Sequence, residues 1–395
     1  MGVSRMCVLS DPGMAHSGIA WRGARGYARA NHLFIEGCGI ARLMQDSFTN
    51  PWRGSAIAVD APFPLDDAGD VARLLAACPA HAPTPLHDVP ALATRAGVAQ
   101  VFLKDERARM GLGSFKALGA AHAIAREAAQ SVQDNDWAHA LSGRIYVTAS
   151  AGNHGLSVAA GARLFGAQAV IYLAHSVPEA FAERLAAKGA QVVRAGATYE
   201  ESMEAAEAAA RAPGRTLLSD SSWPGYMDLP LRVMEGYLQL AAEAATQMDA
   251  APTHILLQAG VGGLAAAVAA HARAVWGDAP TIVVVEPQAA PALIESIRAG
   301  HAVTTQGPVS AMGRLDCKAP SLIALRGLAR DADLFVTISE EEAAQAVDIL
   351  AEEGFATTPS GAAGIAALFA GLLAGLDCGR DARVMAILSE GPEEA

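Results

Sequence analysis

The chain has 395 residues, of which 52% are hydrophobic and 18% charged, and this composition excludes a disordered chain and suits about two globular domains. The formal net charge of −12 argues against a nucleic-acid-binding surface. The apolar runs are alanine-rich and interrupted by Gly, Arg or His, so no membrane-spanning segment is expected. The five cysteines are scattered without metal-ligand spacing, which predicts a cytoplasmic protein with no disulfide framework and no metal site.

The N-terminal part of the chain gives few signals before residue 81. Proline-containing breaks at 49–51 and 62–64 predict that residues 1–80 form an irregular arm or outer layer. A short helix is predicted at 90–95, because a proline is tolerated in the first turn of a helix. A strand at 101–103 and a helix from 117 to about 129 follow.

Lys116 lies between that strand and that helix, in the stretch Gly111-Leu-Gly-Ser-Phe-Lys-Ala-Leu-Gly119. The glycines allow the backbone to turn tightly at low steric cost. Partial desolvation at such a junction would disfavour the ammonium, lower the pKa of the lysine and make the amine a nucleophile. Amine nucleophiles of this kind form Schiff bases with carbonyl groups. An exposed lysine at a helix start is the simpler interpretation, but the motifs further along the chain favour a lysine that forms a Schiff base.

A second motif follows the predicted strand at 144–149. It is the turn Ser150-Ala-Gly-Asn-His-Gly155, which leads into a predicted helix at 156–164. A strand, a small-residue turn and a helix together create an anion site, because the free N–H groups of the helix start face the turn. A substrate carboxylate suits the turn and a phenolate oxygen suits Asn153; a plain connecting turn is the alternative.

An acidic residue follows the next group of elements. Strands at 169–173 and 192–194 alternate with helices at 179–188 and 199–211, and a short strand then leads to Asp220. Ligands of open parallel α/β sheets bind beyond the carboxyl ends of the strands, which is where Asp220 is expected. An aspartate that caps a helix or a turn is the alternative.

A glycine-rich turn lies between a strand at 253–258 and a helix at 264–276. Gly260, Gly262 and Ala265 match the GxGxxA fingerprint, and Glu286, at the end of a strand at 281–286, follows at the spacing of a ribose-binding acid. The same backbone N–H groups bind any phosphate monoester, so the local pattern leaves both ligands open. A dinucleotide would leave Lys116 and the 150–155 turn unused, whereas an aldehyde that carries a phosphate would use all three.

The C-terminal part contains a strand at 333–339, a helix at 340–352, a turn at 358–361, a helix to about 373 and a strand at 383–388. Ser389 and Glu390 follow the last strand and are predicted to face opposite ways. A neutral hydroxyl at Ser389 beside a pyridine nitrogen would leave that nitrogen unprotonated, which favours elimination at a β carbon over transamination. An ordinary strand-end hydroxyl is the alternative.

The chain resembles the fold-type II family of pyridoxal-phosphate enzymes over about residues 83–391. The resemblance rests on motifs that recur in order, namely Gly-Ser-Phe-Lys116, Ser-Ala-Gly-Asn153-His, Gly260-Val-Gly-Gly263 and Ser389-Glu-Gly. The family includes serine and threonine dehydratases, threonine synthase and diaminopropionate ammonia-lyase. The chain is most similar to the last of these, through the segments 84–90, 103–116, 220–226 and 312–321.

The resemblance implies an α/β fold of two doubly wound open-sheet domains, similar to the tryptophan synthase beta subunit. Residues 81–119 and 236–395 would form the larger cofactor-binding domain, with 1–80 on its outside and 120–235 as a smaller inserted domain. Pyridoxal 5'-phosphate would be held as a Schiff base on Lys116. The other cofactor-binding residues would be Phe115, Asn153, Gly260, Val261, Gly262, Gly263 and Ser389.

The resemblance also implies how a substrate would be handled. Its carboxylate would bind at Ser150, Ala151, Gly152, Asn153 and His154, and Lys116 or Asp220 would remove its α proton. In the ammonia-lyases an aspartate implicated in handling the D-isomer stands directly before the Gly-Asn-His. That position is Ala151 here, as in the dehydratases, whereas the counterpart of the second acid, Asp220, is present.

The expected activity is α,β-elimination of a small β-substituted amino acid in amino-acid catabolism, giving a 2-oxo acid and ammonia, with 2,3-diaminopropionate as the favoured substrate. A serine/threonine-type dehydratase, or a lyase for another β-substituted amino acid, is the alternative of the same class. A non-catalytic or dinucleotide-binding protein is the alternative of a different class. A homodimer is expected, because dimers are the commonest assemblies.

Overall fold

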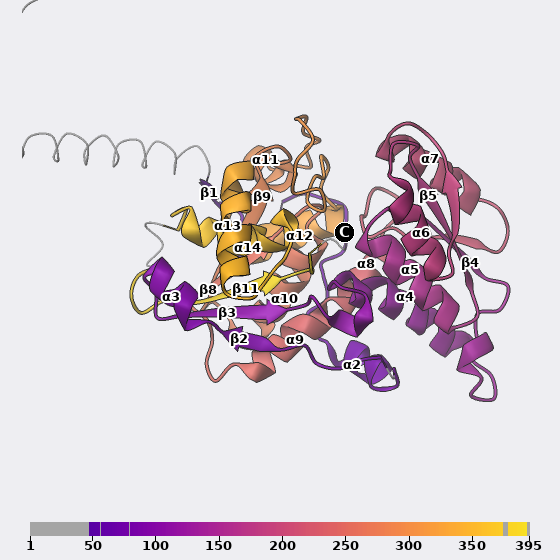
Figure 1. Cartoon of the computed structure of the whole chain (residues 1–395), viewed down its shortest axis with the longest axis horizontal. Helices are drawn as coiled ribbons and strands as arrows, with labels where there is room; N and C mark the ends of the chain where they lie inside the picture. Colours follow the sequence, from indigo (N-terminus) through magenta and orange to yellow (C-terminus); the bar gives the residue numbers. More distant parts are fainter. Residues whose placement is uncertain (1–46, 56, 79, 374–377, 393–395) are drawn as a thin grey trace, which may run out of the picture. The chain divides into compact units, whose positions relative to one another are not determined.

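The structure, a computed structural model, describes residues 47–55, 57–78, 80–373 and 378–392 (Figure 1). These residues contain a seven-stranded sheet of order β1-β10-β9-β8-β11-β3-β2 and a four-stranded sheet of order β6-β5-β4-β7. The strands of the large sheet are β1 (Ser47–Thr49), β2 (Leu86–Asp88), β3 (Gln100–Asp105), β8 (His254–Gln258), β9 (Thr281–Pro287), β10 (Leu334–Ile338) and β11 (Arg383–Leu388). Those of the small sheet are β4 (Ile145–Ala149), β5 (Gln168–Leu173), β6 (Gln191–Arg194) and β7 (Arg215–Leu217).

The centre of the large sheet is parallel, and only its edge strands β1 and β2 run antiparallel to their neighbours. All residues of β8 and β10 are buried, as expected for parallel strands covered on both faces. Helices α10 (Gly263–Trp276) and α14 (Pro359–Phe369) both pack on β8. Helix α13 (Glu340–Glu352) lies beside α14 (Figure 1).

The small sheet is wholly parallel. Val147 and Ala149 of β4 pack with Ala206 of α7 (Tyr199–Ala210), whereas Tyr146 joins the main core to which α5 (Asn153–Leu164) contributes. Side chains alternate along a strand, so the two helices cover opposite faces of β4. Helix α6 (Glu179–Ala187) packs on β6 and against α5.

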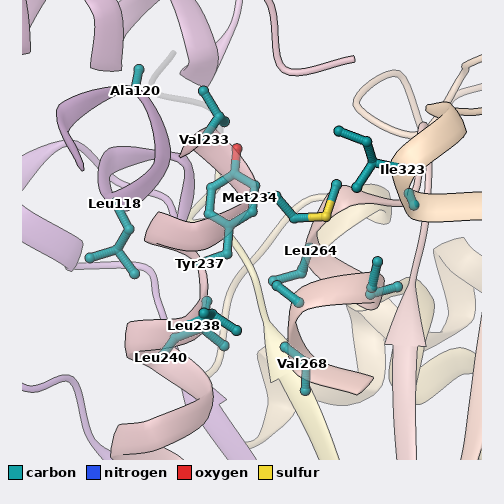
Figure 2. Close-up of a cluster of buried hydrophobic side chains, with 14 of the residues drawn as sticks. Leu118, Ala120, Val233, Met234, Tyr237, Leu238, Leu240, Leu264, Val268 and Ile323 are labelled. Atoms are coloured by element: carbon teal, nitrogen blue, oxygen red, sulfur yellow. The ribbon is translucent and has the colours of Figure 1, made fainter. Parts of the chain in front are cut away.

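One continuous core joins the helices that follow the predicted functional motifs (Figure 2). Among its members are residues of α4 (Lys116–Ser131), α8 (Asp228–Gly236), α9 (Leu238–Gln247), α10 and α12 (Leu322–Asp331). Tyr237 lies between α8 and α9, and its ring is surrounded by these helices in Figure 2. Helices α4 and α10 are therefore held by shared apolar packing.

The remaining helices are α2 (Gly69–Ala76), α3 (Pro90–Ala96) and α11 (Ala292–Ala299), with short 3-10 turns at Arg109–Gly111 and Trp137–His139. The predicted arm at 1–80 is described only from residue 47. There Asn50 donates to the carbonyls of Ala329 and Ala332 at 2.8 and 2.6 Å, which fixes β1 on the edge of the large sheet.

The small sheet lies within the predicted inserted segment, since all its strands fall between 145 and 217. Residues 46–395 nevertheless cluster as one compact unit, so the domain boundaries at 119/120 and 235/236 stay a prediction. Within the described ranges, no helix combines the length and the apolar character needed to cross a membrane.

Candidate functional site

Lys116 is the first residue of α4, one residue earlier than the sequence predicts. The loop before it turns through left-handed backbone at Met110, Gly111 and Gly113. Phe115 N donates to Ser389 O at 3.0 Å, and Gly391 N donates to Gly113 O at 3.0 Å. These bonds hold the lysine loop against the C-terminal end of β11, beside Ser389.

A buried ionic cluster fixes the loop that precedes Lys116. Arg109 donates to Glu106 at 2.7 Å and to Glu243 at 2.7 Å, and Lys104 Nζ donates to the same Glu243 carboxylate at 2.8 Å. Burial raises the pKa of Glu243, but Arg109 and Lys104 outweigh it and lower this pKa to about 2. The carboxylate therefore remains ionised and ties β3, the 3-10 turn and α9 together.

Lys116 forms an ion pair with Asp220, which follows β7 in the small sheet. Burial lowers the pKa of Lys116, but the Asp220 carboxylate outweighs it, so this pKa is raised above its usual value. The prediction that Lys116 has a lowered pKa is therefore wrong for the pair as it stands, because Asp220 outweighs the effect of burial. Burial likewise raises the pKa of Asp220, and Lys116 more than reverses this, so Asp220 is an anion beside the amine.

The glycine turn at 260–263 lies next to this ion pair. Gly262 has φ +97° and caps the N-terminus of α10, so the turn needs a residue without a side chain there. A Cβ on Gly260 would lie 3.0 Å from both Cys317 Sγ and Leu315 Cα, and one on Gly263 would lie 4.0 Å from the backbone oxygen of Asp220. The N-terminus of α10 therefore lies close to the backbone of Asp220.

Tyr237 adds a buried hydroxyl beside the glycine turn. A Cβ on Gly119, one turn after Lys116, would lie 2.8 Å from Tyr237 Oη, and one on Gly263 would lie 3.6 Å from the opposite edge of the ring. Among the described residues, none forms a hydrogen bond with this hydroxyl. A buried hydroxyl without a partner costs about 1–3 kcal/mol, so its presence points to a ligand. An amine, an anion-binding helix start and a spare hydroxyl together suit an aldehyde that carries a phosphate.

In the turn predicted to bind a carboxylate, two backbone N–H groups already have a hydrogen-bond partner within the turn. Helix α5 begins at Asn153, three residues earlier than predicted, and Ser150 Oγ accepts the N–H groups of Gly152 and Gly155 at 3.3 and 3.2 Å. His154 Nε2 lies 2.8 Å from the Leu218 carbonyl, and burial lowers the pKa of His154. The His154 ring is thus held through Nε2 by the backbone near β7.

Glu390 is the main residue that the sequence analysis missed. Its carboxylate accepts hydrogen bonds from Asn153 Nδ2 and Thr358 Oγ1, and it lies 3.7 Å from Arg314 Nε. The prediction placed it opposite Ser389 by alternation along a strand. Strand β11 ends at Leu388, however, so alternation does not fix the direction of Glu390.

Two cavities adjoin this group of side chains, with volumes of about 310 and 420 Å³. Arg314, Thr358 and Glu390 line both of them, and Asn153 lines the larger one. Lys116 and Asp220 line neither. Of the predicted site residues, Asn153 is therefore the one that lines either of these cavities.

Glu286 does not serve the dinucleotide interpretation. It is fully buried and accepts the N–H groups of Leu293 and Ile294, both at 2.7 Å, at the start of α11. Burial raises its pKa to about 8. Glu286 thus caps a helix, and the GxGxxA match lacks the acidic residue that a ribose requires. Within the described part of the chain, no group of three or more His, Cys, Asp or Glu side chains has metal-binding geometry.

Comparison with known sequences gives consistent results. Residues 77–390 match the family model described as "Pyridoxal-phosphate dependent enzyme". The chain is 31% identical over 318 residues to the diaminopropionate ammonia-lyase of Salmonella typhimurium, covering 74% of this chain and 78% of the relative. It is also 31% identical over 292 residues to the L-serine dehydratase/L-threonine deaminase of Mus musculus, covering 73% of this chain and 83% of the relative.

Comparison with solved structures agrees with the sequence matches. The diaminopropionate ammonia-lyase of Escherichia coli in complex with D-serine superimposes with a TM-score of 0.79 at 28% identity, covering 88% of this chain and 93% of the other. Threonine deaminase isoform 2 of Solanum lycopersicum superimposes with a TM-score of 0.70 at 22% identity, covering 87% and 94% of the two chains, and this match speaks for the fold alone.

Proposed function

The chain belongs to the pyridoxal-phosphate dependent enzyme family, and from that premise we propose that it is an ammonia-lyase that eliminates the β substituent of a small amino acid. The predicted fold-type II architecture and the predicted cofactor are both confirmed. We propose 2,3-diaminopropionate as the favoured substrate, converted to a 2-oxo acid and ammonia. The Lys116–Asp220 ion pair beside the glycine turn is the observation that carries the proposal.

Lys116 and Asp220 would together carry out the proton transfers of the reaction. An ammonium has no lone pair, so Lys116 Nζ must lose a proton before it can attack a carbonyl carbon. Asp220 Oδ2 contacts that nitrogen and is ionised, so it holds the ammonium in place until the proton leaves to solvent. Once the substrate amine has displaced Lys116, either the freed amine of Lys116 or the carboxylate of Asp220 would accept the α proton of the substrate. General-base catalysis of this kind contributes about 10²–10⁴-fold to a rate.

The remaining predicted residues would hold the cofactor. When bound, pyridoxal phosphate supplies an aldehyde that captures amines and a pyridine ring that accepts electrons from the substrate α carbon. The N–H groups at Gly260, Val261, Gly262 and Gly263 would bind its phosphate, with Phe115 beside it. Asn153 would donate to the ring oxygen and Ser389 would face the ring nitrogen. Asn153 Nδ2 now donates to Glu390, so we expect this amide to exchange partners when the ring is present.

The turn at 150–154 would bind the substrate carboxylate. Ala151 has no acidic group, so among the predicted site residues Asp220 supplies the carboxylate at the amine. A single carboxylate at the amine also suits the alternative, a serine/threonine-type dehydratase. Relatives described as L-serine dehydratase/L-threonine deaminase match the chain.

Measuring 2-oxo acid and ammonia release from the purified holoenzyme tests the proposal. We expect L-2,3-diaminopropionate to be consumed with higher kcat/KM than L-serine, L-threonine and other β-substituted amino acids. A yellow preparation that borohydride bleaches would demonstrate the Schiff base independently. A colourless protein that takes up no pyridoxal phosphate would contradict the proposal.

We further propose that the enzyme acts in the cytoplasm as a homodimer. Scattered cysteines are typical of proteins from reducing compartments, and cyclic dimers are the commonest oligomers. Light scattering coupled to size-exclusion chromatography would measure the mass directly. A single-chain mass of 40.5 kDa in solution would contradict the dimer.

A further inference from the structure

We infer that Arg314 is a substrate-binding residue, whose guanidinium pairs with the α-carboxylate of the amino acid. The inference rests on the proposed function, because it concerns the same site. Arg314 belongs to the segment 312–321, which the sequence analysis used only as a mark of resemblance. The segment lies between α11 and α12 and forms no helix or strand of its own.

The backbone of this segment packs directly on the glycine turn. A Cβ on Gly260 would lie 3.2 Å from the Arg314 carbonyl oxygen and 3.0 Å from Leu315 Cα. Arg314 N donates to Ser360 Oγ, at the start of α14, at 3.1 Å. The position of Arg314 is thus set by the same turn that we assign to the cofactor phosphate.

The side chain of Arg314 extends from there onto the carboxylate turn. A Cβ on Gly152 would lie 3.4 Å from Arg314 Nε and 3.6 Å from Cζ, so the guanidinium lies against the bare backbone of this glycine. The side chain lines both cavities and remains 28% exposed. The guanidinium is therefore accessible from both cavities and lies against the turn.

The turn by itself is a weak anion site. Two of its N–H groups already donate to Ser150 Oγ, which leaves fewer donors for a carboxylate. A guanidinium offers a planar pair of donors that matches a carboxylate. Arg314 would supply the charge that the turn lacks.

Glu390 lies beside this guanidinium, with its Oε2 3.7 Å from Arg314 Nε. The same carboxylate accepts hydrogen bonds from Asn153 and Thr358. These bonds fix Glu390 where it lines both cavities together with Arg314.

Other cations of the larger cavity have different attachments. Arg107 donates to both carboxylate oxygens of Asp105, at 2.9 and 2.8 Å. The Arg184 guanidinium lies 5.9 Å from the ring centroid of Phe181 on α6. Arg184 is thus a matched control, because it carries the same charge into the same cavity from a different element.

The test compares two amines that differ only in the carboxylate. L-alanine has the α-carboxylate but no leaving group, and L-alaninol replaces the carboxylate by a hydroxymethyl group. Binding of each to the holoenzyme is followed by the change in cofactor absorbance, so no turnover is needed. We expect Arg314→Gln to raise the Kd of L-alanine about 10- to 100-fold and that of L-alaninol less than about threefold. Arg314→Lys should recover part of the loss, and Arg184→Gln should leave the ratio of the two Kd values unchanged.

The outcomes separate this inference from the function on which it rests. Equal weakening of both amines by Arg314→Gln, or no weakening of either, would overturn the role of Arg314 and leave the proposed elimination intact. A wild-type holoenzyme that binds neither amine would overturn the proposed function, and this inference with it. With a reacting substrate, KM should rise more than kcat falls, since the α-carboxylate is bound in both the ground state and the transition state.

Discussion

Replacing Asp220 by asparagine tests the ion pair on which the proposed chemistry depends. The amide keeps the size of the side chain but neither pairs with an ammonium nor accepts the α proton of a substrate. Loss of a positioned general base lowers a rate by about 10²–10⁴-fold, and each factor of ten corresponds to 1.36 kcal/mol in the activation free energy. We therefore expect Asp220→Asn to lower kcat for 2-oxo acid release by that factor.

The same substitution should make cofactor binding easier at low pH, although it lowers kcat. Burial lowers the pKa of Lys116 and the Asp220 carboxylate raises it, so removing the carboxylate leaves the effect of burial alone. The amine of the variant is then neutral at lower pH. The rate at which apoenzyme gains visible absorbance with pyridoxal phosphate should reach its plateau at a lower pH than in wild type.

The assay needs both readings on the same preparations. Asp333→Asn serves as a control, because it removes another ion-paired carboxylate, that of Arg53 and Arg273, next to β10. Its kcat should equal that of wild type. Turnover of Asp220→Asn within threefold of wild type on every substrate, with an unshifted capture profile, would refute the catalytic reasoning and leave Asp220 a structural residue.

Further predictions follow from the lysine, the glycine turn and the ionic cluster. Lys116→Ala should abolish the borohydride-sensitive absorbance and nearly all turnover, and a yellow, active variant would contradict the scheme. Gly262→Ala should raise the Kd of pyridoxal phosphate at least tenfold, because residue 262 has φ +97° and the new Cβ would lie 3.0 Å from Ala324 Cβ. Gly277→Ala is the control, because residue 277 has φ +58° but no atom lies within 4 Å of the new Cβ. This control should leave the Kd unchanged. Glu243→Gln should lower the free energy of unfolding by about 3–5 kcal/mol, since it leaves buried Lys104 without its carboxylate and Arg109 with Glu106 alone. The Glu243 pKa is lowered from 4.5 to about 2, so this contribution is present above pH 4.5 and is lost as the pH falls toward 2; urea titrations that show no such acid-dependent difference would contradict it.

The strands and the lysine junction could be predicted from the sequence because each carries a local signal. Continuous β-branched runs identify β9 and β4, and small-residue turns between a strand and a helix identify the starts of α5 and α10. Lys116 and Asp220 lie 104 residues apart, yet both follow strands, and their side chains are in contact. That both contact a common ligand stays a prediction.

The helices α8, α9, α11 and α12 were not predicted. Helix α8 contains a proline at position 230, and α12 follows a coil without a side-chain cap, so the ordinary start signals are weak. The edge strands β1 and β2 have only three residues each and owe their pairing to β10 and β3. Tertiary pairing of this kind leaves no local pattern to detect.

Arg314, Glu390 and Tyr237 were missed as site residues for a related reason. Arg314 lies in a coil, Glu390 follows the end of β11 and Tyr237 lies at a helix junction, so no periodicity fixes where their side chains point. Arg314 lies against Gly152, Tyr237 against Gly119 and Glu390 against Gly361. A glycine reveals such a contact only when the neighbouring backbone is already known.

The contact between Tyr237 and Gly119 makes the two positions a single steric unit. A methyl group at 119 would lie 2.5 Å from the tyrosine ring, and the ring cannot retreat because its far edge faces Gly263. Evolution of the lysine helix is therefore coupled to a residue more than one hundred positions away. In homologous chains, a side chain larger than hydrogen at the position of Gly119 should occur only together with a smaller residue at the position of Tyr237.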